Sequence, residues 1–114
     1  MTPHTYNGLT KLVTAMADVR KNTGKKTFFG KDKGQESYSK FLHALKATMQ
    51  AMVLDGVIRE STSTEDVATE LEGKLEKFAM AYPNWQDAYG FAAFFLHDQR
   101  EDAIATMNRL RSTP

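Results

Sequence analysis

Lysines and phenylalanines gather between residues 24 and 34, in the sequence GKKTFFGKDKG, where they could bind an anion. The basic side chains are Lys25, Lys26, Lys31 and Lys33, and the rings are Phe28 and Phe29. Lysines neutralise phosphates, and aromatic rings stack on the bases of single-stranded nucleic acid. The rings could instead plug a helical core, since burying one phenylalanine contributes about 1.5 to 3 kcal/mol. The sequence leaves open core packing, contact with a partner protein, and binding of nucleic acid or anionic lipid.

Other residues that could do chemistry lack the partners that a reaction needs. His97 and Glu101 stand one helical turn apart, but no second pair of matching spacing accompanies them, as a di-metal site in a helical bundle would require. The glycines and lysines of the 24–34 segment do not have the Walker A spacing, and the G-x-S-x-G motif is absent. The chain contains no cysteine, which excludes thiolate zinc sites and thiol nucleophiles. We expect no enzymatic activity, no cofactor and no bound metal.

The elements that would position these residues belong to one domain by length and composition. The chain has 114 residues, of which 41% are hydrophobic and 25% charged, as in ordinary globular domains. We therefore expect residues 1–114 to form a single helical domain. No apolar run approaches the ~20 residues of a membrane-spanning helix, and the first residues do not resemble a signal peptide, so we expect a cytoplasmic location.

The net charge of +1 divides unevenly along the chain. Residues 1–56 hold nine Lys and Arg against four Asp and Glu, whereas residues 57–114 hold six against ten, giving +5 and −4. Such an imbalance can mark an interaction surface. It can equally be internal, because basic helices that lie against acidic ones attract each other without any partner.

Apolar residues recur at helical spacing in the first three segments. Leu9, Leu12, Val13, Met16 and Val19 predict a helix over about 6–22. Tyr38, Leu42, Leu45, Met49 and Met52 predict a second one, which Asp55-Gly56 ends. Val67, Leu71, Leu75, Phe78 and Tyr82 predict a third, which Pro83 ends. Thr62 with Glu65, or more loosely Ser63 with Asp66, would cap its start.

The fourth segment, Trp85 to Leu96, is apolar or small at nearly every position. A helix without a polar face is buried, so we expect the other helices to surround this one. Asp98 and Glu101 could open a last helix, or one long helix could run over 84–111. The sequence therefore predicts an all-α fold, a compact bundle of four to five helices.

A bundle of this size can hardly cover a helix on every side, so we expect part of the aromatic segment to remain exposed. The preferred function is a small non-catalytic protein-interaction domain, such as an adaptor, inhibitor or assembly factor. It would use a patch around Trp85 and Tyr89 together with the 24–34 segment, and the partner would be another protein or a second copy. The alternative is a nucleic-acid-binding protein that uses the basic, phenylalanine-containing 20–33 segment.

Overall fold

The computed structural model describes residues 3–22, 33–80, 82–83 and 85–112. They form five α-helices and one turn of π-helix. The elements are α1 (Pro3–Asn22), α2 (Lys33–Leu54), α3 (Thr64–Ala79), α4 (Trp85–Ala93), the π-helical turn η1 (Phe94–Asp98) and α5 (Arg100–Ser112). No strand occurs in these ranges, which confirms the prediction of an all-α bundle. None of the helices there combines the length and apolarity that crossing a bilayer requires.

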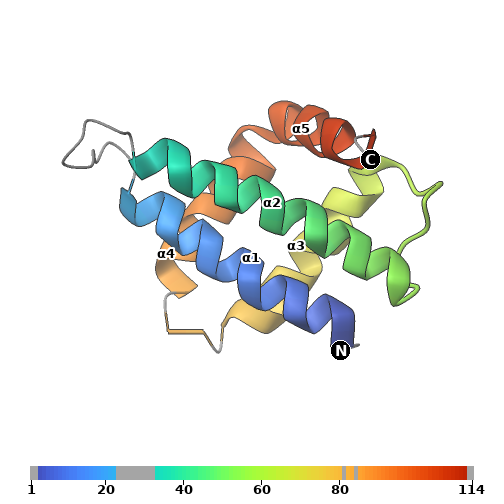
Figure 1. The fold of residues 1–114 in the computed structure, drawn as a ribbon, viewed down its shortest axis with the longest axis horizontal. Coiled ribbons are helices and arrows are strands. Elements are labelled where there is room, and N and C mark those ends of the chain that lie inside the picture. The colour runs from blue at the N-terminus through green and yellow to red at the C-terminus, as the bar shows by residue number, and fades with distance from the viewer. Residues whose placement is uncertain (1–2, 23–32, 81, 84, 113–114) are drawn as a thin grey trace.

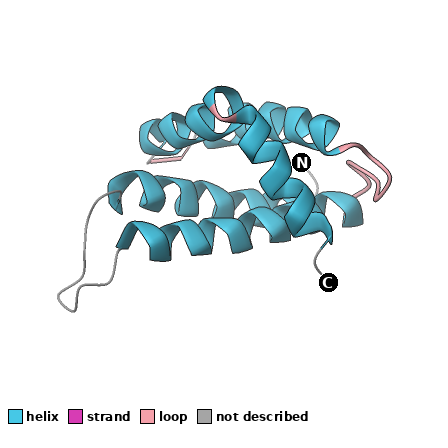
Figure 2. Ribbon diagram, turned by 90° about the horizontal axis from the view of Figure 1, so that it is seen from above, coloured by secondary structure: helices cyan, strands magenta, loops and turns pink. Residues whose placement is uncertain are grey.

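The helices lie in two layers (Figures 1 and 2). α1 and α2 run side by side in one layer, and α3 and α4 form the other. α5 leaves the α3–α4 layer and slants across to the C-terminal half of α2, so that it spans both layers (Figure 2). This crossing brings the last turn of α5 close to the last turn of α2.

The most enclosed helix is α1. Nine of its positions are buried, including small residues such as Gly8, Ala15 and Ala17. A Cβ atom at Gly8 would lie only 3.0 Å from Thr48 Cα, so the glycine is what allows α1 and α2 to approach so closely. The expectation that the Trp85–Leu96 segment is surrounded on all sides is wrong. α1 is more enclosed, because its small residues let neighbouring helices pack closely, but it too keeps an exposed face, as at Lys11 and Asp18.

Glycine chemistry ends α2 as predicted. Gly56 has φ +76°, a left-handed conformation that suits glycine. The backbone N–H of Val57 donates to Met52 O and that of Gly56 to Val53 O, which is the Schellman arrangement. The chain then folds back and buries Ile58. α2 therefore ends at a defined point, which fixes where the connection to α3 begins.

The start of α3 corrects one of the capping assignments. The Ser63 hydroxyl accepts a hydrogen bond from the backbone N–H of Asp66 at 3.2 Å, so Ser63 is the N-cap. Thr62 Oγ1 instead accepts from the backbone N–H of Arg59 within the preceding turn. The Thr62 and Glu65 pairing is therefore wrong, and the looser alternative is the one that forms.

α4 and α5 are separate helices, which confirms the expectation of a distinct last helix and excludes the alternative of one long helix over 84–111. In the turn η1 the backbone N–H of Gln99 donates to Phe94 O at 2.8 Å, five residues back. Gln99 itself has φ −114° and ψ 37°, outside the helical region. α5 then starts at Arg100 and takes a new direction.

Candidate functional site

The aromatic residues of α4 and η1 divide between the core and the surface. Phe91 and Phe95 are buried, and their rings meet Phe41 of α2 edge-on, with centroids 4.8 Å and 5.0 Å away. Tyr89 and Phe94 remain 53% and 48% exposed. The segment is thus anchored through Phe91 and Phe95, while the rings of Tyr89 in α4 and Phe94 in η1 remain uncovered.

Trp85 and Tyr89, the two predicted site residues of this helix, lie together. Their ring centroids are 5.1 Å apart with an interplanar angle of 56°. Trp85 is half-buried, whereas Tyr89 is exposed. The sequence spacing of four residues predicts this contact, since such residues are neighbours on one helix face.

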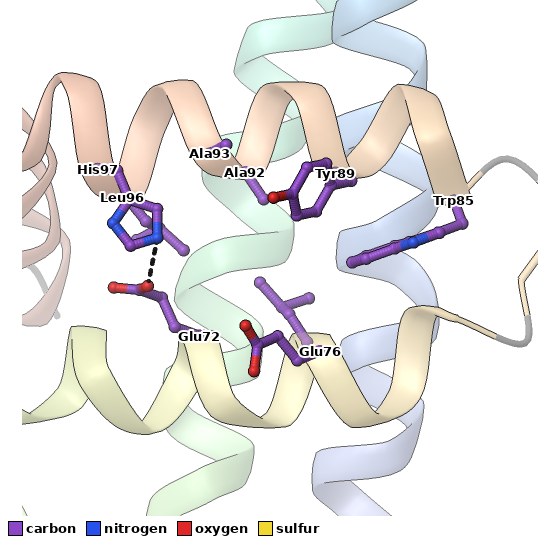
Figure 3. Close-up of a pocket in the computed structure, with 9 residues that line it drawn as sticks. Glu72, Glu76, Trp85, Tyr89, Ala92, Ala93, Leu96 and His97 are labelled. Atoms are coloured by element: carbon purple, nitrogen blue, oxygen red, sulfur yellow. Dashed lines mark ion pairs between the residues drawn. The ribbon is translucent and has the colours of Figure 1, made fainter.

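A small hollow lies between α3 and α4, next to these two rings (Figure 3). Trp85 and Tyr89 stand at one end of it, and Glu72 and His97 face each other at the other end. Its volume is about 30 Å³. That is room for one or two water molecules, whereas sites for small molecules usually measure about 300 to 1,000 Å³. The rings therefore form a surface patch and not the wall of a ligand pocket.

Glu72 links α3 to η1 and to the start of α5. Its Oε2 lies 2.9 Å from His97 Nε2, and its Oε1 accepts from Arg100 Nη1 at 2.5 Å. Arg100 also donates to Leu96 O at 3.0 Å and to Thr69 Oγ1 at 3.1 Å. His97 is exposed over 67% of its side chain, and Glu72 over 23%. This network fixes the relative position of α3, η1 and the start of α5.

The sequence suggested a different partner for His97, namely Glu101. Periodicity within one helix could not reveal the contact with Glu72, because it joins residues 25 positions apart and depends on how α3 packs against η1. In the part of the chain that the structure describes, no group of three or more His, Asp or Glu side chains is arranged to hold a metal ion.

The other predicted site residues cannot be placed. Lys25, Lys26, Phe28, Phe29 and Lys31 lie outside the described residues, and so does the side chain of Lys33, whose backbone begins α2. Whether the two phenylalanines are core or surface is therefore untested. Nucleic-acid binding through this segment stays a prediction.

One ion pair links the basic first half of the chain to the aromatic helix. Lys21 Nζ lies 3.9 Å from Asp87 Oδ2, with both side chains about half exposed, 45% and 42%. Such a pair contributes little stability, about 0 to 1 kcal/mol. It does place the end of α1, from which the 23–32 segment departs, next to α4.

Sequence reasoning missed a groove between α2 and α5. The sequence does contain an indication of it. Met49, Val53 and Leu54 make the apolar face of α2 wider than one neighbouring helix can cover. Leu54 is 72% exposed.

Comparison with known proteins does not add to these observations. No family model, no curated protein and no solved structure matches this chain.

Proposed function

We propose that this protein is a small non-catalytic interaction domain that binds another protein, or a second copy of itself, through the α4 surface, the exposed aromatic residues of α4 and η1. The observation that carries the proposal is the exposure of two large rings, Tyr89 at 53% and Phe94 at 48%. Tyr89 belongs to α4 and Phe94 begins η1, and this segment is anchored to Phe41 through Phe91 and Phe95. Rigid aromatic side chains that stay exposed are typical of the residues that dominate protein interfaces.

The charge pattern of α4 supports this use. Between Asp87 and His97 no position carries a formal charge, and the exposed ones include Tyr89 and Phe94. Interfaces are depleted of charged residues at their centre because desolvating a charge is costly. No side chain of the segment itself would bring a charge to desolvate between those two positions, although the Arg20 guanidinium of α1 lies beside Gly90.

The position of Lys21 supports the inclusion of the 24–34 segment in the same surface. Its ion pair with Asp87 brings the end of α1 to α4 just before the 23–32 segment begins. Participation of Lys25, Lys26, Phe28, Phe29, Lys31 and Lys33 in this surface stays a prediction, since their side chains lie outside the described residues.

The contacts of His97, the one histidine that lines the hollow, favour a binding function over a catalytic one. His97 faces the carboxylate of Glu72, which Arg100 also engages. A nucleophilic mechanism would need a hydroxyl hydrogen-bonded to that imidazole. Among the described residues His97 has no such hydrogen bond.

A photo-crosslinking amino acid at position 89 tests the proposal, with the same residue at exposed position 43 of α2 as the matched control. The purified protein is irradiated alone and after mixing with cell extract, and the crosslinked products are separated by mass. We expect a discrete adduct from position 89, either with a second copy or with one other protein, and none from position 43. Equal adducts from both positions, or none from position 89, would refute the proposal. Tyr89→Glu combined with Phe94→Glu should abolish any dimer in sedimentation equilibrium.

A further inference from the structure

A second surface, separate from α4, lies where α5 crosses the end of α2. The two helices and the turn before α3 line an open groove of about 790 Å³. Its apolar lining consists of Met49, Val53, Leu54, Ile58 and Leu110. Of these, Leu54 is the most exposed, at 72%, although leucine gains from burial.

The residues that α2 contributes follow the spacing that receives another helix. Lys46, Met49, Gln50, Val53 and Leu54 all line the groove. Steps of three and four place them on one stripe of α2, about 12 Å long at 1.5 Å per residue. α5 forms the opposite wall with residues near its C-terminal end. A groove between two helix walls is the shape that an amphipathic helix fills with its apolar face.

Arg111 places a fixed positive charge at this groove. Its guanidinium donates to three uncharged acceptors: Nη1 to Thr64 Oγ1 at 3.0 Å, and Nη2 to Glu60 O at 3.0 Å and Arg59 O at 3.4 Å. Across the ranges that the structure describes, no carboxylate lies within 4.0 Å of it. The charge is thus held in place and is not neutralised by an ion pair.

The charges around the groove favour an acidic occupant. Glu60 is the one carboxylate among the lining residues, and Arg59 precedes it directly. Lys46 and Arg111 are the lining cations. An acidic side chain of a bound molecule that faces Arg111 would form the ion pair that the chain itself does not supply there.

We propose that the α2–α5 groove binds an amphipathic α-helix of a partner protein, with leucine-like residues against Leu54 and Val53 and an acidic residue facing Arg111. The open form of the groove supports a helix over a small lipophilic molecule, since small ligands bury about 70 to 90% of their surface in their sites. This inference is independent of the α4 surface and goes beyond it.

Synthetic helical peptides test it. The probe is an 18-residue peptide with leucines at positions i, i+3, i+4 and i+7 and glutamates beside them. The first control replaces each glutamate with lysine, and the second replaces each leucine with serine. The 114-residue chain carries ¹³C-methyl methionine, so that Met49 reports on the groove and Met16 on the core.

We expect the acidic leucine peptide to shift the Met49 methyl signal and leave Met16 unchanged, with at least tenfold weaker binding of both control peptides. Leu54→Glu should abolish binding without unfolding the chain, because the side chain is exposed. Arg111→Gln should weaken the acidic peptide about fivefold. Tyr89→Glu with Phe94→Glu should leave its affinity unchanged, which separates this groove from the α4 surface.

Three results would overturn the inference: equal binding of the glutamate and lysine peptides, no shift at Met49, or full affinity in Leu54→Glu. A small hydrophobic carboxylate that binds more tightly than the peptide would overturn the choice of occupant.

Discussion

The carboxylate of Asp55 accepts a hydrogen bond from the backbone N–H of Thr5 at 2.6 Å, so the residue that follows α2 caps the start of α1. The first N–H groups of a helix have no partner within the helix, and a negative charge there also complements the helix dipole. Two segments 50 residues apart are thereby joined at the same end of the bundle.

Asp55→Ala should lower the free energy of unfolding by about 1 kcal/mol, since the Thr5 N–H loses its acceptor and α1 loses the charge near its N-terminus. Asp55→Asn keeps an acceptor oxygen and should lose less. Urea denaturation measures both. Asp18→Ala, an exposed acid on the same helix, is the control and should change stability by less than about 0.5 kcal/mol. An Asp55→Ala protein as stable as the control would show that the cap contributes nothing.

The same substitution at two helical glycines should have opposite effects. Gly73→Ala adds a methyl group that meets no atom within 4 Å, so it should stabilise the protein by up to about 1 kcal/mol. Gly8→Ala places that methyl 3.0 Å from Thr48 Cα, in the backbone of α2, and should destabilise by about 1 to 3 kcal/mol. Thermal unfolding of the two variants checks the difference. A stabilising Gly8→Ala would mean that α1 and α2 are not held at this separation.

Glu72→Ala should lower the free energy of unfolding by about 1 kcal/mol, because it removes the acceptor that Arg100 and His97 share. The loss should be no larger, because the ion pair of Glu72 with Arg100 is partly exposed to solvent. Glu76→Ala, one turn further along α3 and exposed, is the matched control with an expected change of less than about 0.5 kcal/mol. Since salt screens exposed pairs, the difference between the variants should shrink in 1 M sodium chloride. Equal stabilities of the two variants at low salt would contradict this role of Glu72.

Local periodicity was sufficient to predict the helices and much of the core. Leu9, Leu12, Val13 and Met16 are fully buried, as their spacing predicts. The start of α1 was placed at about residue 6, whereas the helix begins at Pro3. Proline fits the first helical position, but the capping group is Asp55, which no local pattern around residue 3 contains.

Contacts between helices were the part that periodicity could not supply. Trp85 and Tyr89 were predicted as a patch because a small bundle can hardly cover an apolar helix on every side, and their rings do lie together. Apolar content alone made the Trp85–Leu96 segment look buried on every side, yet which helix is enclosed depends on close approaches such as that of Gly8 to Thr48. The partnership of Glu72 with His97 and the groove beside Leu54 likewise exist only once the helices are packed.

The turn η1 affects the α2–α5 groove through the direction of α5. Six consecutive residues, Phe94 to Gln99, set the direction in which α5 leaves α4. None of them lines the α2–α5 groove, but they precede α5, which forms one of its walls. An insertion or deletion in these six residues would redirect α5 and so change the shape of the groove, while every residue that lines it stays the same.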